Sequence, residues 1–277
     1  MDELDFENVV FGYGGNALFN GFSASFAKEQ ISCIVGPNGC GKSTLAKLAM
    51  GLIKPASGRV LIQGRDVASL NPRERARRLG VLVQQQEAPM MTVRELAACG
   101  RFPHHGPLSR LDETDAQCID ETLSLAGVYD LRDRPLRSLS GGQRQRARMA
   151  MVLAQDTPVV VLDEPTSGLD YRECMTVMET VRTMAERGCA VIMVCHDMEV
   201  VSDFAERIVV MADGRILDRG RTHELFSNID LMRRAYVEPP QVIELSRRLA
   251  SSVSTAFAQV SEVSDVVRIT KEMVHRG

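Results

Sequence analysis

A phosphate-binding pattern follows an apolar, β-branched run near the N-terminus. Residues 36–43 read Gly-Pro-Asn-Gly-Cys-Gly-Lys-Ser, which is the spacing G-x-x-x-x-G-K-[ST]. In this pattern backbone N–H groups surround phosphates, the lysine reaches the β and γ oxygens, and the serine hydroxyl reaches Mg²⁺. The run 31–35 predicts a strand that leads into the loop. A helix is expected to begin at Lys42, with its N-terminal dipole facing the same phosphates. A strand, a tight loop and a helix in this order favour an α/β fold.

Acidic and imidazole side chains follow two other apolar runs. Asp163 and Glu164 come directly after the run 159–162, where one carboxylate reaches Mg²⁺ and the next polarises an attacking water. His196 follows the run 190–195. The alternatives are an acidic pair that merely ends a strand and a histidine with a structural role. With the phosphate loop upstream, we interpret these three side chains as parts of one nucleotide site.

Two further residues are weaker candidates for the same site. Gln84 ends a short apolar run and is a candidate ligand for Mg²⁺ or for the lytic water, but Gln85 and Gln86 follow it, so the register stays open by one residue. Tyr13 follows an apolar N-terminal run. It is a candidate to stack on a purine ring, and the alternative is an aromatic residue of the core.

A second glycine-rich helix start lies about a hundred residues after the loop. Ser140 and Gln143 have the spacing of a capping box, and Gly141 and Gly142 lie between them. A plain helix start is the alternative. Two glycines make a poor cap for stability alone but let a phosphate come close. Because the loop at 36–43 already surrounds one side of a nucleotide, this second anion-binding end predicts use in trans, in a dimer with two sites.

The remaining pattern predicts a sheet domain with an insertion. Several apolar runs are continuous rather than alternating, which is typical of strands covered on both faces of a parallel sheet. Helical patterns replace them between about residues 89 and 153, which predicts an inserted helical subdomain. Residues 211–217 predict a hairpin that turns at Asp213-Gly214. The predicted strands are Ile31–Val35, Val60–Ile62, Val81–Val83, Val159–Leu162, Ala190–Cys195 and Ile208–Met211.

A basic run begins at a predicted helix start. Asn71 is a good cap, Pro72 suits the first helical position, and Glu74 is an acid at the third. The arginines of this segment are interpreted as a solvated face rather than a nucleic-acid patch. They are Arg73, Arg75, Arg77 and Arg78.

The chain changes character again at about residue 238, which we take as the end of the main domain (1–237). Two prolines at 239 and 240 end whatever precedes them, and a helical extension is expected over 238–277. ATP binding is expected to survive removal of 241–277. Val242, Leu245 and Leu249 mark one face of a short helix. The same stripe is expected to continue, against a high content of serine and β-branched residues, through Val253, Phe257, Val260, Val263 and Val267.

Composition limits where such a chain works. A net charge of -3 and a pI near 6.0 argue against broad electrostatic capture of nucleic acid. No apolar run approaches the roughly 18 residues needed to cross a bilayer, and the acidic N-terminus has no signal-peptide core. Seven cysteines without a CxxC pair fit a reducing cytosol. A cytoplasmic chain is expected, which serves a membrane only through a partner.

Together these motifs resemble the ATP-binding subunits of ABC transporters over about residues 4–235. The resemblance makes 36–44 the Walker A motif, 159–164 the Walker B motif with its catalytic glutamate, 139–143 the signature motif and 167–170 the D-loop. It implies an ABC cassette of the P-loop NTPase class, with a mainly parallel core sheet, an antiparallel β subdomain, the helical insertion and a short C-terminal extension. The cofactors implied are ATP and Mg²⁺.

The resemblance also assigns roles to single residues. The catalytic residues are Glu164, His196 as the switch histidine, Gln84 as the Q-loop glutamine, and Lys42. The metal ligands are Ser43, Gln84 and Asp163. The residues that bind ATP within one subunit are Tyr13, Gly36, Pro37, Asn38, Gly39, Cys40, Gly41, Lys42, Ser43 and Thr44. Those that act in trans are Ser140, Gly141, Gly142, Gln143 and Asp170.

The same resemblance implies partners. A head-to-tail dimer, with a second copy or a paralogous subunit, is expected to close over two ATP molecules. Hydrolysis is expected to reopen the dimer and move a membrane permease, so the chain is peripheral on the cytoplasmic face of the cell membrane. A solute-binding protein is expected as an indirect partner, and nucleic acid is not.

The transported ligand is less constrained. The stretch 99–104, Cys-Gly-Arg-Phe-Pro-His, resembles importer ATPases for iron–siderophore, haem and cobalamin uptake. The segment 238–245 is closer to energy-coupling-factor ATPases for cobalt, nickel and vitamins. A cytosolic ATPase without a transporter, such as an iron–sulfur assembly scaffold, stays open as a further alternative, and an exporter ATPase is disfavoured but not excluded.

Two side-chain types near these motifs leave alternatives open. His104 and His105 have no nearby cysteine or acid at ligand spacing, so a surface loop is favoured over a metal site. Cys40 lies inside the phosphate loop. Its oxidation or alkylation would crowd the phosphates, and the alternative is a small, inert spacer.

Overall fold

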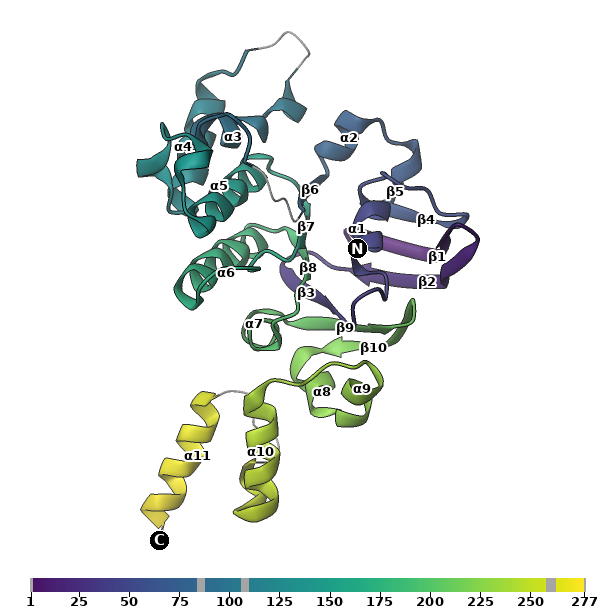
Figure 1. The fold of residues 1–277 in the computed structure, drawn as a ribbon, viewed down its shortest axis with the longest axis vertical. Helices are drawn as coiled ribbons and strands as arrows, with labels where there is room; N and C mark the ends of the chain where they lie inside the picture. Colours follow the sequence, from purple (N-terminus) through teal and green to yellow (C-terminus); the bar gives the residue numbers. More distant parts are fainter. Residues whose placement is uncertain (1, 84–87, 106–109, 258–262, 277) are drawn as a thin grey trace.

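The computed structural model describes residues 2–83, 88–105, 110–257 and 263–276. Its centre is a six-stranded sheet in the order β10-β9-β3-β8-β7-β6, drawn in Figure 1. Strand β10 is antiparallel to β9, and the other neighbours in the order are parallel. The strands are β3 (Gln30–Val35), β6 (Leu79–Leu82), β7 (Val159–Asp163), β8 (Ala190–Val194), β9 (Arg207–Ala212) and β10 (Arg215–Arg221). The mainly parallel core predicted from continuous apolar runs is confirmed.

A smaller antiparallel sheet packs beside it. Its order is β2-β1-β4-β5, and the predicted strand 60–62 belongs here rather than to the parallel sheet. Helix α1 (Lys42–Ala49) begins at Lys42, as predicted, and packs its buried side chains into a core formed with both sheets. The strands are β1 (Leu4–Tyr13), β2 (Asn16–Phe26), β4 (Ser57–Ile62) and β5 (Arg65–Asp66).

The predicted helical insertion is present and has a core of its own. That core includes Val93, Ile119, Leu123 and Ala147. The capping boxes at Asn71 and Ser140 are confirmed, and Thr92 and Asp112 form two more. The α-helices of the insertion are α3 (Val93–Cys99), α4 (Glu113–Leu125) and α5 (Gly141–Ala154), and α2 (Pro72–Ala76) precedes it, before β6. Short 3-10 turns span Val67–Ser69, Phe102–His104, Tyr129–Leu131 and Leu136–Ser138.

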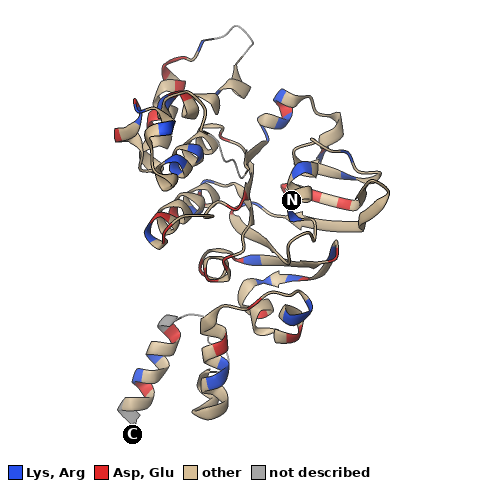
Figure 2. Ribbon diagram, viewed as in Figure 1, with Lys and Arg blue, Asp and Glu red and all other residues tan. Residues whose placement is uncertain are grey.

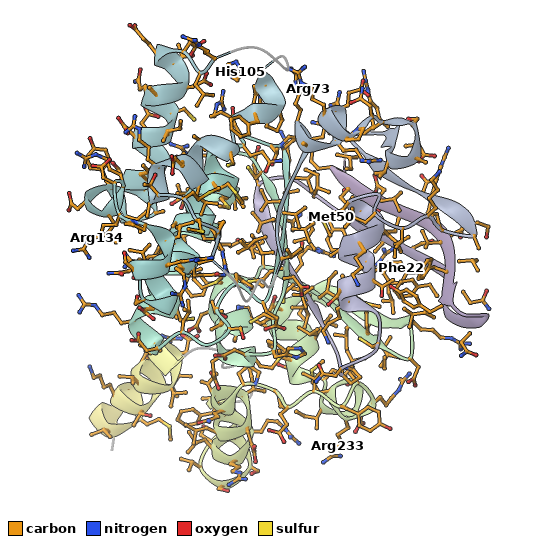
Figure 3. The ribbon with its side chains drawn as sticks, turned by 45° about the horizontal axis from the view of Figure 1, so that its top comes forward. Phe22, Met50, Arg73, His105, Arg134 and Arg233 are labelled. Atoms are coloured by element: carbon orange, nitrogen blue, oxygen red, sulfur yellow. The ribbon has the colours of Figure 1, made fainter. Side chains whose placement is uncertain are left out.

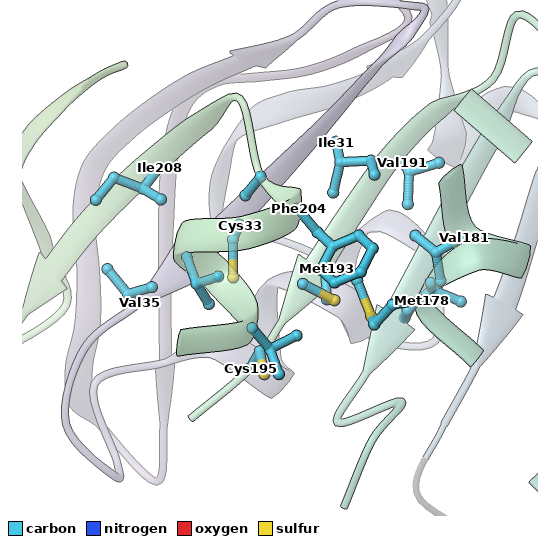
Figure 4. Packing of buried hydrophobic residues seen from close by; sticks show 14 of the residues in the cluster. Ile31, Cys33, Val35, Met178, Val181, Val191, Met193, Cys195, Phe204 and Ile208 are labelled. Carbon is cyan, nitrogen blue, oxygen red and sulfur yellow. The ribbon is translucent and has the colours of Figure 1, made fainter. Parts of the chain in front are cut away.

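The other face of the parallel sheet is covered by the helices that follow β7. Their side chains form the largest apolar cluster with the inner faces of β3, β7, β8 and β9. Figure 4 shows Phe204 of α7 and Met178 and Val181 of α6 against Met193 and Val191 of β8. The helices are α6 (Tyr171–Glu186), α7 (Met198–Phe204), α8 (Thr222–Ser227) and α9 (Ile229–Arg234). The hairpin predicted at 211–217 is confirmed, with Asp213 and Gly214 both at positive φ.

The C-terminal extension is helical but does not continue as one stripe. Helix α10 (Gln241–Ser252) ends at Val253, a 3-10 turn covers Thr255–Phe257, and α11 (Val263–Arg276) begins afresh. The continuous helix predicted through Val253 and Phe257 is therefore wrong, because the serine and β-branched residues there favour a break. Phe257 instead packs against Ile269 of α11.

The extension is anchored to the main domain. Val242 and Ile243 are buried in the large cluster under the parallel sheet, and the Gln241 N–H donates to Glu199 Oε1 of α7 at 2.7 Å. In Figure 1 both tail helices project from the end of the molecule that carries α8 and α9. A boundary at 237 therefore leaves two core residues on the tail side.

Charge and hydropathy match the composition. Basic and acidic residues are interspersed along several helices (Figure 2), whereas α5 carries Arg144, Arg146 and Arg148 and no acidic residue. No helix in the described residues has the length and apolar character needed to span a bilayer.

Candidate functional site

The phosphate loop connects β3 to α1 and needs glycine at two tight points. A Cβ on Gly41, which has a φ of +110°, would lie 2.5 Å from Phe19 Cζ, and one on Gly36 would lie 2.2 Å from the Met211 carbonyl oxygen. Glycine is therefore required by space as well as by backbone angle at these positions. The buried Lys42 ammonium donates to the carbonyl oxygens of Gly36 and Pro37 at 2.7 and 2.9 Å.

Cys40 points away from solvent inside this loop. Its side chain is buried, and a Cβ on Gly36 would lie 3.1 Å from its Sγ. Burial raises the pKa of the Cys40 thiol. Because the thiolate is the reactive form, the structure favours the spacer over the redox-sensitive residue.

A cleft of about 460 Å³ opens over the loop. It brings together side chains that the sequence places more than 150 residues apart, because the carboxyl ends of β3, β7 and β8 meet at one edge of the sheet. The cleft is lined by Tyr13, Leu18, Asn38, Gly39, Gly41, Lys42, Ser43, Thr44, Asp163, Glu164, Val194 and His196. Leu18 and Val194 carry no sequence signal for the site, since both read as ordinary strand residues.

Tyr13 lies at the mouth of the cleft. Its side chain is 51% exposed, which excludes the alternative of a core aromatic. The Tyr13 hydroxyl lies 3.5 Å from Thr44 Oγ1, and its ring meets Phe11 edge-on at 4.9 Å between centroids. These contacts fix the Tyr13 ring, and its exposed face is available to stack on a planar base.

Glu164 and His196 form a pair in the lining of the cleft. His196 Nε2 lies 3.0 Å from Glu164 Oε1. Burial and the neighbouring Asp163 charge raise the pKa of Glu164 to about 7, although Lys42 opposes them. Burial and the Lys42 charge lower the pKa of His196. The backbone of Glu164 has a φ of +54°, an uncommon angle for a residue with a Cβ.

A carboxylate with a pKa near neutrality suits general base catalysis. Such a base accepts a proton and still exists in its ionised form at the working pH. The His196 imidazole lies beside one carboxylate oxygen, and that oxygen, Glu164 Oε1, is buried without a hydrogen-bond partner among the described residues. The pair therefore has the chemistry to activate a water against a phosphate on Lys42.

The oxygen donors in the cleft fit a magnesium ion. Asp163 and the exposed Ser43 both line it, and hard oxygen ligands are those that Mg²⁺ prefers. Mg²⁺ needs few protein ligands when phosphates and waters supply the rest, which agrees with two donors here. Gln84, the third predicted ligand, lies outside the described residues.

The glycine-rich helix start does not belong to this cleft. Ser140 caps α5, with Ser140 Oγ accepting from the Gln143 N–H at 3.1 Å and Gln143 Oε1 accepting from the Ser140 N–H at 3.0 Å. None of the described residues lining the cleft comes from 140–143. Asp170 caps the neighbouring helix α6 and is exposed. The structure thus brings together the residues predicted to act within one subunit and leaves those predicted to act in trans on another surface.

The basic run is not a free solvated face, which corrects the sequence interpretation. Arg73 Nε and Arg77 Nε donate to the Pro103 carbonyl at 2.9 and 2.6 Å, and Figure 3 shows Arg73 and His105 at the same end of the molecule. Arg75 donates to the Leu70 carbonyl and Arg78 to Gln63. The pattern could not show this, because the accepting carbonyls come from a distant turn.

The two histidines next to that turn are also more than surface residues. His104 Nε2 lies 2.8 Å from the Gln155 carbonyl oxygen, and His105 Nε2 lies 2.7 Å from Asp115 Oδ2. Arg101 Nε donates to the other oxygen of Asp115, which is buried. Residues 101–105 therefore connect α4 and the end of α5 to α2, and the two histidines lie half-buried in this turn rather than on a free surface loop.

Comparison with known proteins agrees with this geometry. Residues 19–167, just over half of the chain, match the family model described as ABC transporter. The chain is 35% identical to the probable siderophore transport system ATP-binding protein YusV of Bacillus subtilis over 88% of this chain and 89% of that one. It is 34% identical to the ferric enterobactin transport ATP-binding protein FepC of Escherichia coli over 83% and 85%.

A solved structure shares the fold. The chain resembles cbiO1 from Clostridium perfringens, part of the ABC transporter complex cbiONQ, with a TM-score of 0.74 and 26% identity, over 89% of this chain and 99% of that one. The family model, the two sequence relatives and this structural likeness all agree with the fold described above. The chain belongs to the ABC transporter family, as one of its ATP-binding, ATP-hydrolysing subunits.

Proposed function

We propose that this chain is the ATPase subunit of an importer that takes up an iron–siderophore complex, and that it works as a head-to-tail dimer on the cytoplasmic side of a membrane permease. The observation that carries the ATPase is the cleft that Lys42 lines together with the Glu164–His196 pair. The siderophore class is supported by the names of the two sequence relatives and by the stretch 99–104. Haem and cobalamin are the neighbouring ligand classes.

Within one subunit, each side chain has a part in hydrolysis. Tyr13 receives the purine at the mouth of the cleft, and Lys42 exchanges its two carbonyl partners for the β and γ oxygens. Mg²⁺, held by Ser43 and Asp163, would supply charge neutralisation for the phosphates. Glu164 accepts the proton of the attacking water, and His196 lies against the Glu164 carboxylate, with Nε2 3.0 Å from Oε1.

The dimer completes the site. The first N–H groups of α5 have no partner within the helix, and the positive end of the helix dipole favours an anion there. We place the γ-phosphate of ATP held by one subunit at this helix end of the other. Removal of the γ-phosphate then takes away the group that both subunits share, and the dimer opens.

A replacement that stops proton transfer tests the dimer. Glu164→Gln keeps the shape of the side chain, so ATP binding is expected to persist and a closed dimer to accumulate. Size-exclusion chromatography with light scattering at saturating ATP and Mg²⁺ measures the mass. A Glu164→Gln protein that stays monomeric while ATP is bound contradicts the sandwich.

A second experiment addresses the ligand. The chain is purified from membranes with its permease, the permease is identified by mass spectrometry, and the ATPase rate is measured with candidate solute-binding proteins. Stimulation by a siderophore-loaded binding protein supports the proposal. A small coupling subunit instead of a binding-protein-dependent permease would favour the energy-coupling-factor type, and a soluble partner would favour an assembly scaffold.

A further inference from the structure

An acidic side chain lies on the helix end that the proposed dimer uses. Glu173, in the first turn of α6, reaches across to the start of α5. Its Oε1 lies 3.4 Å from Ser140 Oγ. A Cβ built on Gly142 would lie 2.1 Å from Glu173 Cδ and 2.2 Å from its Oε1, so the carboxylate group lies directly against the Gly142 backbone.

The contact covers the glycine that the motif provides for close approach. Ser140 and Gly141 are exposed, whereas Gly142 is buried. A glycine at the first turn of a helix leaves room for an anion to reach backbone N–H groups. In this subunit that room holds a carboxylate of the same chain.

The geometry also connects Glu173 to the second element that acts in trans. The Glu173 N–H donates to Asp170 Oδ1 at 2.8 Å, which caps α6. The backbone of Glu173 thus contacts Asp170, the D-loop residue that caps α6, and its side chain contacts the start of α5, the helix of the signature motif. The signature motif and the D-loop are both expected to contact nucleotide on another subunit. If the Glu173 carboxylate moves away from Gly142, the movement occurs where these two segments meet.

We propose that Glu173 is an internal competitor for the γ-phosphate: its carboxylate occupies the anion site at the start of α5 in the nucleotide-free subunit and must be displaced when the dimer closes over ATP. This inference rests on the in-trans dimer proposed above. Two anions cannot share one helix end without repulsion, so the residue raises the ATP concentration at which the dimer forms. ATP binding to a single subunit is unaffected, because no residue of 140–143 or α6 is among the described residues lining the cleft.

The test removes the charge and keeps the shape. In a Glu164→Gln background, Glu173→Gln is expected to lower the ATP concentration for half-maximal dimer formation roughly two- to fivefold, the range expected for one charge at a helix end. Analytical ultracentrifugation across an ATP titration measures it. Glu173→Asp, which keeps the charge but shortens the side chain, is expected to give a smaller decrease.

Two controls define what each result means. Glu179→Gln lies on the same helix, where its exposed carboxylate pairs with Arg182, and is expected to leave the titration unchanged. Binding of a fluorescent ATP analogue at protein concentrations that keep the chain monomeric is expected to be the same for Glu173→Gln and its parent.

The failures are distinguishable. A Glu164→Gln parent that never dimerises refutes the in-trans dimer itself. A parent that dimerises, with a Glu173→Gln titration that is unchanged or shifted to higher ATP, refutes the competitor alone. A shift to higher ATP would mean that the carboxylate holds the signature helix in its binding conformation through Ser140.

Discussion

Replacing Glu164 with glutamine should stabilise the nucleotide-free subunit above neutral pH, although it removes the catalytic base. Burial and Asp163 raise the pKa of Glu164 from its usual value near 4.5 to about 7, and each tenfold change in proton affinity is worth about 1.4 kcal/mol. Keeping this carboxylate ionised inside the fold therefore costs up to about 3 kcal/mol. Glutamine has nearly the same shape without the charge, so Glu164→Gln is expected to gain about 1–3 kcal/mol at pH 8.

The sign of the pH dependence follows from the same shift. The folded state binds the proton of Glu164 more tightly than the unfolded chain does, so the wild type loses stability as the pH rises from about 4.5 through about 7. The advantage of Glu164→Gln should therefore be largest at pH 8 and small at pH 5. Because the pKa of His196 is lowered, the imidazole does not take up the proton that Glu164 releases near neutrality.

Urea unfolding followed by circular dichroism at pH 5, 6, 7 and 8 measures this difference. Glu186→Gln, an exposed carboxylate on α6, is the matched control and should show no pH-dependent gain. A Glu164→Gln protein that is less stable than the wild type at pH 8, or equally more stable at every pH, would refute the reasoning. If Glu164→Gln were less stable than the wild type at pH 8, contacts with neighbouring groups would stabilise the ionised carboxylate more than burial destabilises it.

Three other changes test separate parts of the structure. Lys42→Ala should weaken ATP binding roughly 10- to 100-fold, because a charge-assisted contact to phosphate is lost; unchanged affinity by isothermal titration calorimetry would contradict its role. Asp115→Asn should destabilise the fold by about 3 kcal/mol, since it leaves the largely buried Arg101 guanidinium without its carboxylate, and urea unfolding measures this. Ending the chain at residue 240 should cost about 3 kcal/mol or more, because Val242 and Ile243 are buried. Ending it after Val253 should not, and equal stability of the two truncations would contradict the anchoring of the tail.

The sequence predicts the site residues that lie at the carboxyl ends of parallel strands, because the strand order brings these ends together. Asp163, Glu164 and His196 each follow a strand of the parallel sheet, and parallel strands bring their carboxyl ends to one edge. The position of each residue after its own strand is therefore enough to place all three over the phosphate loop. The cleft confirms this for Lys42, Ser43 and the three strand-end residues.

What the sequence does not predict depends on contacts between distant segments. Nothing in the spacing of Glu173 pairs it with Gly142, because their contact requires the packing angle of α5 on α6. In the same way, Arg73 and Arg77 are at helical spacing on what looks like an exposed face, and their acceptor at Pro103 is known only once the turn is placed. Local propensity accounts for the break in the tail at Val253, which the apolar spacing alone conceals.

Some site residues lie at strand ends, and others are placed by contacts between distant segments. This difference explains how one subunit can hold its ATP firmly and still move the surface that meets a second subunit. The phosphate loop, Asp163 and His196 end strands of a sheet with apolar side chains packed on both faces. Helix α5 belongs to both parts: Ala147 and Ala150 lie in the separate core of the helical subdomain, whereas Met149, Val152 and Leu153 are buried in the cluster under the parallel sheet. Apolar cores resist sliding because they are close-packed, so the C-terminal half of α5 stays with the sheet. The exposed start of α5, at Ser140 and Gly141, lies outside both clusters, and it is therefore the part whose contacts the fold can exchange when Glu173 leaves it.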